Sequence, residues 1–200
     1  MGLFGLVLLL VWLAVVSVGR SVAVARGGGP APMRLGDPVG SPQWWSRVLG
    51  VVGFSSAVAA PVADTAGLPA LAALDEPAVV VVGLALVGAG AALSLAGQAA
   101  MGASWRADVD PDARTPLITD GPFRFVRNPI LAGVLVSMFG LGCVTPNILS
   151  IAMVACVLAS IEIQVRLVEE PYLIRVHGAA YRDYATRVGR LVPGLGHLRG

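Results

Sequence analysis

The sequence predicts an all-α polytopic membrane protein with about five transmembrane helices, including a C-terminal helical hairpin, followed by an interfacial helix. Of its 200 residues, 56% are apolar and only 13% are charged. This composition is too apolar for an ordinary soluble domain and is typical of a polytopic membrane protein. Long uncharged runs support the same class. The net charge of +2 gives no support to a role in nucleic-acid binding.

The N-terminal half contains three apolar runs of membrane length, over residues 3–18, 48–63 and 78–96. For the first run a cleaved signal peptide is the alternative, which the absence of a preceding basic residue disfavours. The second run is short and is expected to end at Pro61. The third is rich in glycine, which predicts close packing against another helix.

Two further runs, over residues 130–144 and 148–168, are separated only by Thr145-Pro146-Asn147. At about 1.5 Å per residue they cover roughly 22 Å and 31 Å, against a hydrocarbon core of about 30 Å. Backbone amides cannot remain unpaired in lipid, so two helices joined by a tight turn are expected. This hairpin would return Asn128 and Glu169 to the same membrane face, which suggests a site there.

The basic residues predict the orientation, because all of them are Arg and they cluster in alternate connections. They lie between the first two expected spans (Arg20, Arg26, Arg34, Arg47), between the third and fourth (Arg106, Arg114, Arg124, Arg127), and from Arg166 to Arg199. The positive-inside rule therefore places the N-terminus outside and the C-terminus inside. The bias toward Ala, Val, Gly and Arg suggests a GC-rich bacterial genome, and hence the bacterial inner membrane.

Polar residues outside the spans suggest how the rest of the chain is arranged. The carboxylates of Asp108, Asp110 and Asp112 lack EF-hand spacing, so no metal site is expected. Cys143 and Cys156 are expected to be small apolar fillers. We expect a division into residues 1–97, with three spans, and residues 98–200, with the hairpin and the site.

After the fifth span, a short helix is expected to begin at Glu169-Glu170-Pro171, where proline is tolerated near a helix start. The run through Tyr181 and Tyr184 is amphipathic and predicts an interfacial helix. The arginines expected on its polar side are Arg175, Arg182, Arg187 and Arg190.

Six short motifs follow one another between residues 105 and 194. They are Trp-Arg, Arg-Thr-x-Leu-Ile-Thr-x-Gly-Pro-Phe-Arg, Arg-Asn-Pro, Glu-Glu after the hairpin, His-Gly-x-x-Tyr-x-x-Tyr, and Val-Pro-Gly. In this order and spacing the chain resembles the isoprenylcysteine carboxyl methyltransferase family, which is similar to the membrane phospholipid N-methyltransferases. The resemblance implies a cofactor, S-adenosylmethionine, bound without a soluble dinucleotide-type domain.

The resemblance also implies a set of cofactor-binding residues. Backbone groups of Thr115, Pro116, Leu117 and Ile118 would hold adenine, Phe123 would line the pocket, and Asn128, Pro129, Ile130 and Leu131 stand where the family has His-Pro-x-Tyr. Glu169 takes the place of the acid that binds the methionyl amine, and Glu170 follows it. Because Asn replaces His and Leu replaces Tyr, a catalytic base is not supported.

Physical reasoning supports Glu169 independently, because a carboxylate where a span leaves the bilayer is costly unless it is paired. A cofactor ammonium would be a suitable partner, and the alternatives are Arg166, Arg124 or Arg127. The candidate catalytic residues are Asn128 and Arg166. Arg166 lies one residue from the family's acceptor-binding Arg and could hold an anionic acceptor or extend to the headgroups.

The function expected is methyl transfer from S-adenosylmethionine, bound on the cytoplasmic side, to a lipophilic or amphipathic acceptor that enters among the membrane lipids. An isoprenoid carboxylate, a thiol and a lipid amine all remain open as acceptors. One alternative is a membrane NADPH-dependent sterol-type reductase, which would need Arg124 and Arg127 for the 2′-phosphate. Another is a non-enzymatic membrane interaction protein in which Glu169 and Glu170 only pair with Arg.

Overall fold

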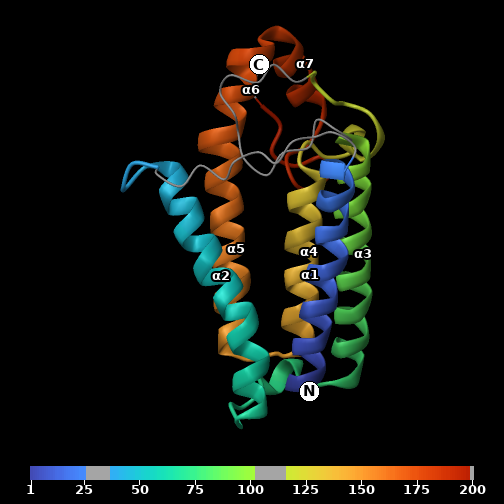
Figure 1. Cartoon of the computed structure of the whole chain (residues 1–200), viewed down its shortest axis with the longest axis vertical. Helices are drawn as coiled ribbons and strands as arrows, with labels where there is room; N and C mark the ends of the chain where they lie inside the picture. Colours follow the sequence, from blue (N-terminus) through green and yellow to red (C-terminus); the bar gives the residue numbers. More distant parts are fainter. Residues whose placement is uncertain (26–36, 102–115, 199–200) are drawn as a thin grey trace.

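The structure, a computed structural model, describes residues 1–25, 37–101 and 116–198, without the side chains of residues 18–25. It confirms the all-α class (Figure 1). The long helices are α1 (Gly2–Ala25), α2 (Pro42–Thr65), α3 (Pro77–Met101), α4 (Pro129–Val144) and α5 (Ile148–Ile163), with a short 3-10 turn η1 (Ala72–Leu74) before α3. Within the described ranges, β-type pairing is confined to one parallel bridge between Val126 and Gly189.

The helices have the length and surface of membrane spans. Three are long and apolar enough to cross a bilayer, namely Pro42–Thr65, Pro77–Met101 and the continuous helix Ile148–His177. Gly2–Ser17 and Pro129–Val144 are shorter apolar helices. Large apolar side chains are exposed on the outer faces of these helices, among them Leu3, Val7, Val51, Val58, Val81 and Ile151. Exposed apolar surface of this extent requires lipid, so the chain is an integral membrane protein.

Two helix boundaries differ from the sequence expectation. Pro61 does not end the second span, because α2 continues through it to Thr65. Nor does Glu169 begin a separate helix. After α5 the chain continues as a π-helical segment, η4 (Gln164–Glu169), directly into α6 (Glu170–His177). Pro171 lies directly after the π-helical segment, in which the backbone N–H of Glu170 donates to the Val165 carbonyl.

The two arms of the hairpin pack against different partners. α4 packs mainly against α3, whereas α5 packs mainly against α2, and α1 lies beside α2 and α3 (Figure 1). At the turn between the arms, the Asn147 side chain accepts hydrogen bonds from the backbone N–H groups of Leu149 and Ser150 and donates to the Ala60 carbonyl of α2 at 2.9 Å. These contacts cross the expected division between residues 1–97 and 98–200, which stays a prediction.

Close packing of α3 on α4 confirms the expectation from the glycines. A Cβ atom on Gly90 would lie 2.4 Å from the Gly133 carbonyl oxygen, and one on Gly83 would lie 2.7 Å from that of Gly140. Ser94 of α3 also donates a hydrogen bond to the Ile130 carbonyl at 3.0 Å. Packing against α3 therefore fixes the position of the start of α4, where the candidate site begins, relative to α3.

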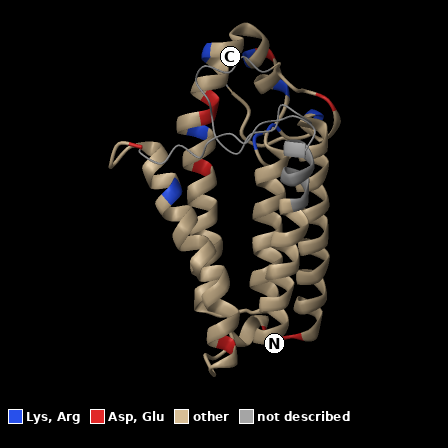
Figure 2. Ribbon diagram, viewed as in Figure 1, with Lys and Arg blue, Asp and Glu red and all other residues tan. Residues whose placement is uncertain are grey.

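The charged residues gather at one end of the helices. Arg residues lie toward the end that carries α6 and α7 (Ala179–Arg187), whereas the charged residues coloured at the other end of the ribbon are acidic (Figure 2). At the Arg-rich end, the 3-10 turn η3 (Gly121–Arg124), α6, α7 and residues 188–198 form a small cap over α4. We call residues 188–198 the C-terminal segment.

Candidate functional site

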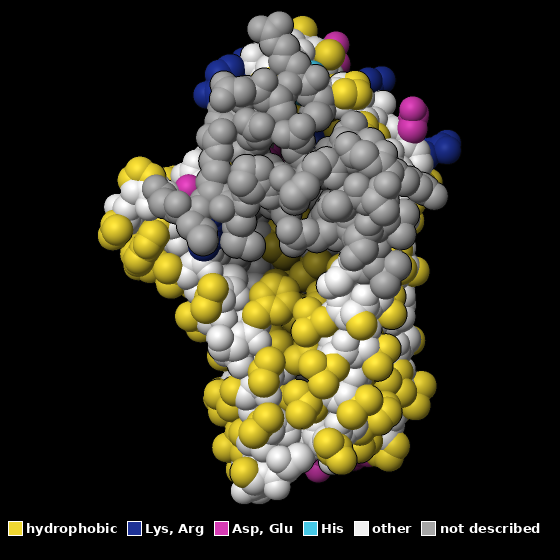
Figure 3. All heavy atoms as spheres, in the orientation of Figure 1, with side chains coloured by type: hydrophobic (Ala, Val, Ile, Leu, Met, Phe, Trp, Pro, Cys, Tyr) yellow, Lys and Arg dark blue, Asp and Glu magenta, His cyan; other side chains and the backbone are white. Residues whose placement is uncertain are grey.

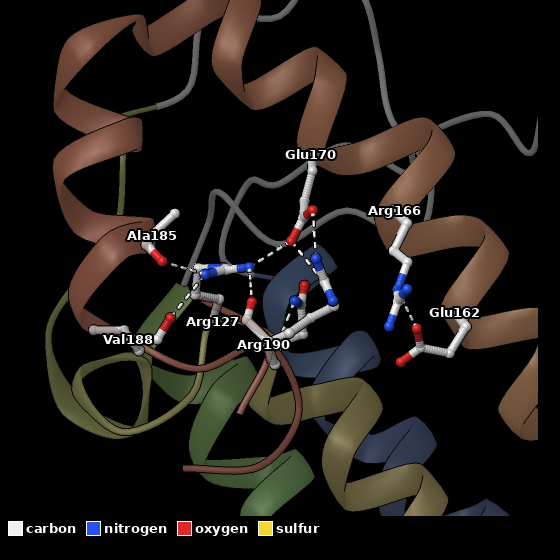
Figure 4. Close-up of polar contacts among 9 residues, drawn as sticks. Arg127, Glu162, Arg166, Glu170, Ala185, Val188 and Arg190 are labelled. Carbon is white, nitrogen blue, oxygen red and sulfur yellow. Dashed lines mark hydrogen bonds and ion pairs between the residues drawn. The ribbon is translucent and has the colours of Figure 1, made fainter. Parts of the chain in front are cut away.

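Arg127, Glu170 and Arg190 form a buried ion-pair cluster inside this cap (Figure 4). Arg127 Nη2 lies 2.5 Å from Glu170 Oε1, and the side chains are 1% and 7% exposed. Arg190 binds the same carboxylate with two donors, Nε to Oε1 at 2.8 Å and Nη2 to Oε2 at 2.9 Å. Glu170 is thus shared by two guanidinium groups, and the cluster carries one net positive charge.

Arg127 also ties the start of α4 to the end of α7. Its Nη1 donates to the carbonyl oxygens of Ala185 and Val188, both at 2.7 Å, and its Nη2 donates to that of Gly196 at 3.0 Å. Carbonyls in the last turn of a helix have no partner within the helix, so the guanidinium satisfies groups that burial would otherwise penalise. Arg127 is therefore a structural junction among three parts of the cap.

The C-terminal segment pairs with the residues just before α4. The backbone N–H of Arg127 donates to the Gly189 carbonyl at 2.8 Å, and that of Asn128 donates to the Arg190 carbonyl at 3.1 Å. A Cβ atom on residue 189 would lie 2.3 Å from the Val192 carbonyl oxygen, so the turn that follows requires glycine. This pairing brings Arg190 to Glu170 and places it beside Asn128.

The π-helical segment η4 carries Glu169 directly before the ion-pair cluster. π-Helical turns are rare and occur frequently at functional sites. Glu169 is half-buried, and its Oε1 accepts a hydrogen bond from Gln164 Nε2 at 3.4 Å. Glu170 turns into the cap while its neighbour remains more accessible. The two adjacent carboxylates therefore lie in different environments.

Two tyrosines of α7, Tyr181 and Tyr184, are buried in the cap together with the ion-pair cluster. Tyr184 donates a hydrogen bond to the Phe123 carbonyl at 2.6 Å, and its ring packs edge-on against Tyr181 with centroids 6.2 Å apart. Burial raises the pKa of Tyr184 to about 12. Burial also raises the pKa of Tyr181, and the charges of Glu170 and Glu169 add to this while Arg127 opposes it. Neither phenol is a base near neutral pH.

The residues expected to bind a cofactor lie in several places. Thr115 falls outside the described residues, Pro116 is exposed, and Leu117 and Ile118 are half-buried, with Leu117 packed against Tyr181, Tyr184 and Ala185. Phe123 and Pro129 are buried, Asn128, Ile130, Leu131 and Glu169 are half-buried, and Glu170 is buried in the ion-pair cluster. Asn128 is hydrogen-bonded to Arg190, and Arg190 is hydrogen-bonded to Glu170, the residue next to Glu169. Leu131, by contrast, packs against the hydrophobic core of the helices.

Arg166 is not part of the cluster. It lies in η4 with a side chain 57% exposed and pairs with Glu162 one turn earlier. In Figure 4 this pair lies to one side of Glu170. Its expected role toward an acceptor stays a prediction.

Arg190 was missed as a site residue by the sequence analysis. It was expected on the polar side of the interfacial helix, but α7 ends at Arg187, and the side chain of Arg190 is only 12% exposed. The available signal was the Val-Pro-Gly motif just after it, which marks a turn that ends the helix and folds the chain back.

The donor set suits a small zwitterion better than a metal ion. Arg190 Nη1, on the side of the guanidinium away from Glu170, makes no hydrogen bond within the described part of the chain, and Glu169, the residue directly before Glu170, is half-buried. The pKa of Arg190 is raised, chiefly by its hydrogen bonds to Glu170, and the charge of Glu162 on α5 acts in the same direction. Among the described residues no group of His, Cys, Asp and Glu could hold a metal.

Comparison with known proteins identifies the family of the chain. A search of curated proteins finds no match. The model of the phospholipid methyltransferase family matches residues 78–180, a little over half of the chain, and this stretch contains α3, both arms of the hairpin, Asn128, Glu169 and Glu170. The chain therefore belongs to the phospholipid methyltransferase family, a family of membrane methyltransferases.

Proposed function

We propose that this membrane methyltransferase transfers a methyl group from S-adenosylmethionine to an apolar or amphipathic acceptor at its Arg-rich end. The observation that carries the proposal is the ion-pair cluster, which fixes the start of α4 and the end of η4 to one another within the family-matched region. Asn128 and Glu169 are thereby held at the same end of the hairpin by contacts that are independent of lipid.

Each half of the cofactor has suitable partners in the cap. When bound, S-adenosylmethionine supplies an electrophilic methyl group on a sulfonium. The Glu169 carboxylate would hold the methionyl ammonium, an opposite charge that offsets the cost of placing a carboxylate at the membrane surface. The backbone at Pro116, Leu117 and Ile118 lies outside the helices and offers carbonyl acceptors, with N–H donors at Leu117 and Ile118, for adenine.

The surroundings favour positioning over acid–base chemistry. Asn128 carries no titratable group, Leu131 has no hydroxyl, and burial holds the Tyr184 phenol neutral with a pKa of about 12. The protein would therefore contribute orientation and exclusion of water, which suffice for a displacement when the acceptor is already a good nucleophile. A thiolate, a carboxylate or a neutral amine meets that condition.

The acceptor would reach the site from the membrane. Apolar side chains cover the helices on the face shown in Figure 3, including the hollow between α2 and α1 below the cap. A lipophilic chain in contact with this surface would present its polar end at the depth of the Arg-rich end. By the positive-inside rule that end is cytoplasmic, and a bacterial inner membrane fits the residue usage.

Calorimetric titration of S-adenosylmethionine into the detergent-purified full-length protein tests the proposal. Wild-type protein should bind the cofactor, and Glu169→Gln should weaken binding roughly tenfold or more, because a charged hydrogen-bond partner is lost. Arg187→Gln on the exposed face of α7 is the matched control and should bind normally. Absence of binding to wild type at high micromolar cofactor would contradict the assignment.

The reductase alternative gains no support from the geometry. Arg127 donates to Glu170 and three carbonyls, and Arg124 is exposed and lies over the Phe125 ring at 5.5 Å, so the two do not form a phosphate cradle. The non-enzymatic alternative correctly anticipates pairing of Glu170 with Arg127. It differs from our proposal in predicting that Glu169→Gln alters stability without affecting ligand binding.

A further inference from the structure

We propose that Arg190 is a carboxylate-binding residue of the cofactor pocket and that Glu170 is the positioning residue that aims it. This inference rests on the proposed function and adds the group that recognises the acidic end of the cofactor. It also separates the roles of the two adjacent glutamates, with Glu169 facing the ligand and Glu170 facing the protein.

The first argument is the charge of the ion-pair cluster. Two guanidinium groups share the one carboxylate of Glu170, in a place where the three side chains are 1%, 7% and 12% exposed. Burying an unpaired charge is costly, so the excess positive charge calls for an anion. The Glu162 carboxylate, which faces Arg190 from α5, is already paired with Arg166.

The second argument is the direction of the donors. Arg127 is not available to a ligand, because its Nη1 and Nη2 donate to Glu170 and to carbonyls of the cap, and its Nε, which has no partner among the described residues, is buried in a side chain that is only 1% exposed. Arg190 uses only its Nε and Nη2 edge, which leaves the Nη1 donors directed away from Glu170. Arg190 is also the most exposed of the three side chains, as a ligand-binding group must be.

The third argument is the precision with which Arg190 is held. Its guanidinium is fixed by both oxygens of Glu170, and its carbonyl accepts hydrogen bonds from the backbone and side-chain N–H groups of Asn128. Gly196 leaves room for it, because a Cβ atom there would lie 3.1 Å from Arg190 Nη1. An arginine preorganised in this way loses little freedom when it binds a planar carboxylate.

The methionyl end of the cofactor carries an ammonium and a carboxylate on one carbon. Glu169 and Arg190 offer the complementary pair of charges, and each is directly adjacent to Glu170, Glu169 along the chain and Arg190 through hydrogen bonds. Substitution of Glu170 should therefore impair recognition of the carboxylate through Arg190, without loss of a direct ligand contact.

Two ligands that differ only in this carboxylate provide the test. Wild-type, Arg190→Gln and control Arg187→Gln proteins, all full length in detergent, are titrated calorimetrically with S-adenosylmethionine and with its decarboxylated form, which keeps the ammonium and the sulfonium. Wild type and control should prefer S-adenosylmethionine by roughly tenfold to a hundredfold, the range for a charged hydrogen-bonded pair. In Arg190→Gln that preference should fall to near unity, chiefly through weaker binding of S-adenosylmethionine.

Glu170→Gln should reduce the same preference without abolishing binding of the decarboxylated ligand. If Arg190→Gln weakens both ligands equally, or if wild type binds both equally, Arg190 does not contact the carboxylate, although the proposed function stands. Because the wild-type comparison needs no variant, poor folding of Arg190→Gln leaves the inference testable. If wild type binds neither ligand, the proposed function fails and this inference fails with it.

Discussion

Asn128 and Arg190 are joined twice, because the backbone N–H and the side-chain amide of Asn128 both donate to the Arg190 carbonyl, at 3.1 Å and 3.3 Å. The residue expected to take the place of a family histidine therefore anchors the C-terminal segment. Its side-chain N–H is engaged with the protein and holds the Arg190 carbonyl beside the first turn of α4.

This relationship predicts how the protein tolerates changes at Asn128. Asn128→Ala removes one neutral hydrogen bond and should lower the free energy of unfolding by about 0.5–1.5 kcal/mol. Asn128→Asp should cost more, about 1–3 kcal/mol, because a carboxylate would then face the Arg190 carbonyl oxygen. Thermal unfolding in detergent measures both, and an Asp variant as stable as wild type would exclude the proposed anchor.

Arg127 is predicted to be more important for stability than for ligand affinity. Arg127→Ala leaves Glu170 with a single partner and removes the guanidinium donors to the carbonyls of Ala185, Val188 and Gly196, of which Ala185 still accepts from the Leu198 N–H; this should cost about 3–5 kcal/mol. Arg124→Ala, three residues earlier and exposed, should change stability by less than about 0.5 kcal/mol. Equal melting temperatures for the two variants would contradict the assigned role.

The interface between α3 and α4 offers a prediction with an internal control. Gly90→Ala places a methyl group against the Gly133 carbonyl and should destabilise the protein by about 1–3 kcal/mol through separation of the helices. Gly88→Ala lies on the same helix with nothing within 4 Å and should be neutral or stabilising by up to about 1 kcal/mol. Denaturation in detergent, followed by circular dichroism, compares them. A similar loss in both would contradict a specific contact between residue 90 and the Gly133 carbonyl, because helix propensity alone favours Ala over Gly.

Alkaline pH should lower the stability of the folded protein through ionisation of Tyr184 in the cap. Burial raises the folded-state pKa of Tyr184 to about 12, above the value of about 10 for an exposed phenol. The folded protein therefore keeps this proton to a higher pH than the unfolded chain does. The free energy of unfolding is independent of this group below about pH 10 and falls as the pH rises toward 12. Melting temperatures across this range should fall less steeply for Tyr184→Phe. If melting temperature falls equally steeply with pH in wild type and Tyr184→Phe, a group other than Tyr184 causes the loss of stability.

Much of the helical architecture could be predicted from the sequence. The five apolar runs are helices, and the turn at Asn147 falls where the polar interruption indicated. The continuation of the helices through Pro61 and Glu169 could not be predicted, because it depends on packing around each residue more than on the conformational preference of the residue itself. A proline can remain within a helix when neighbouring helices support the segment.

The candidate site was predictable only in part. Glu169 and Asn128 could be named as candidates from the order of the motifs. The length of the hairpin between them independently places both at one membrane face. The different surroundings of Glu169, which is half-buried, and Glu170, which is buried in the ion-pair cluster, could not be predicted, because adjacent residues of one motif differ only in what each faces after folding. Arg190 was assigned to a helix surface because amphipathic periodicity gives no information about where the helix ends.

The sequence by itself determined that this chain is a helical membrane protein with a polar site at one end. The physical reason is that lipid forces every long uncharged run to satisfy its backbone internally, so composition and spacing leave little choice. Only the tertiary structure decided that Arg127 and Arg190 share Glu170. That arrangement depends on a C-terminal segment folding back over α4. The contacts join residues 20 to 69 positions apart, so they are set by three-dimensional packing and have no local sequence pattern.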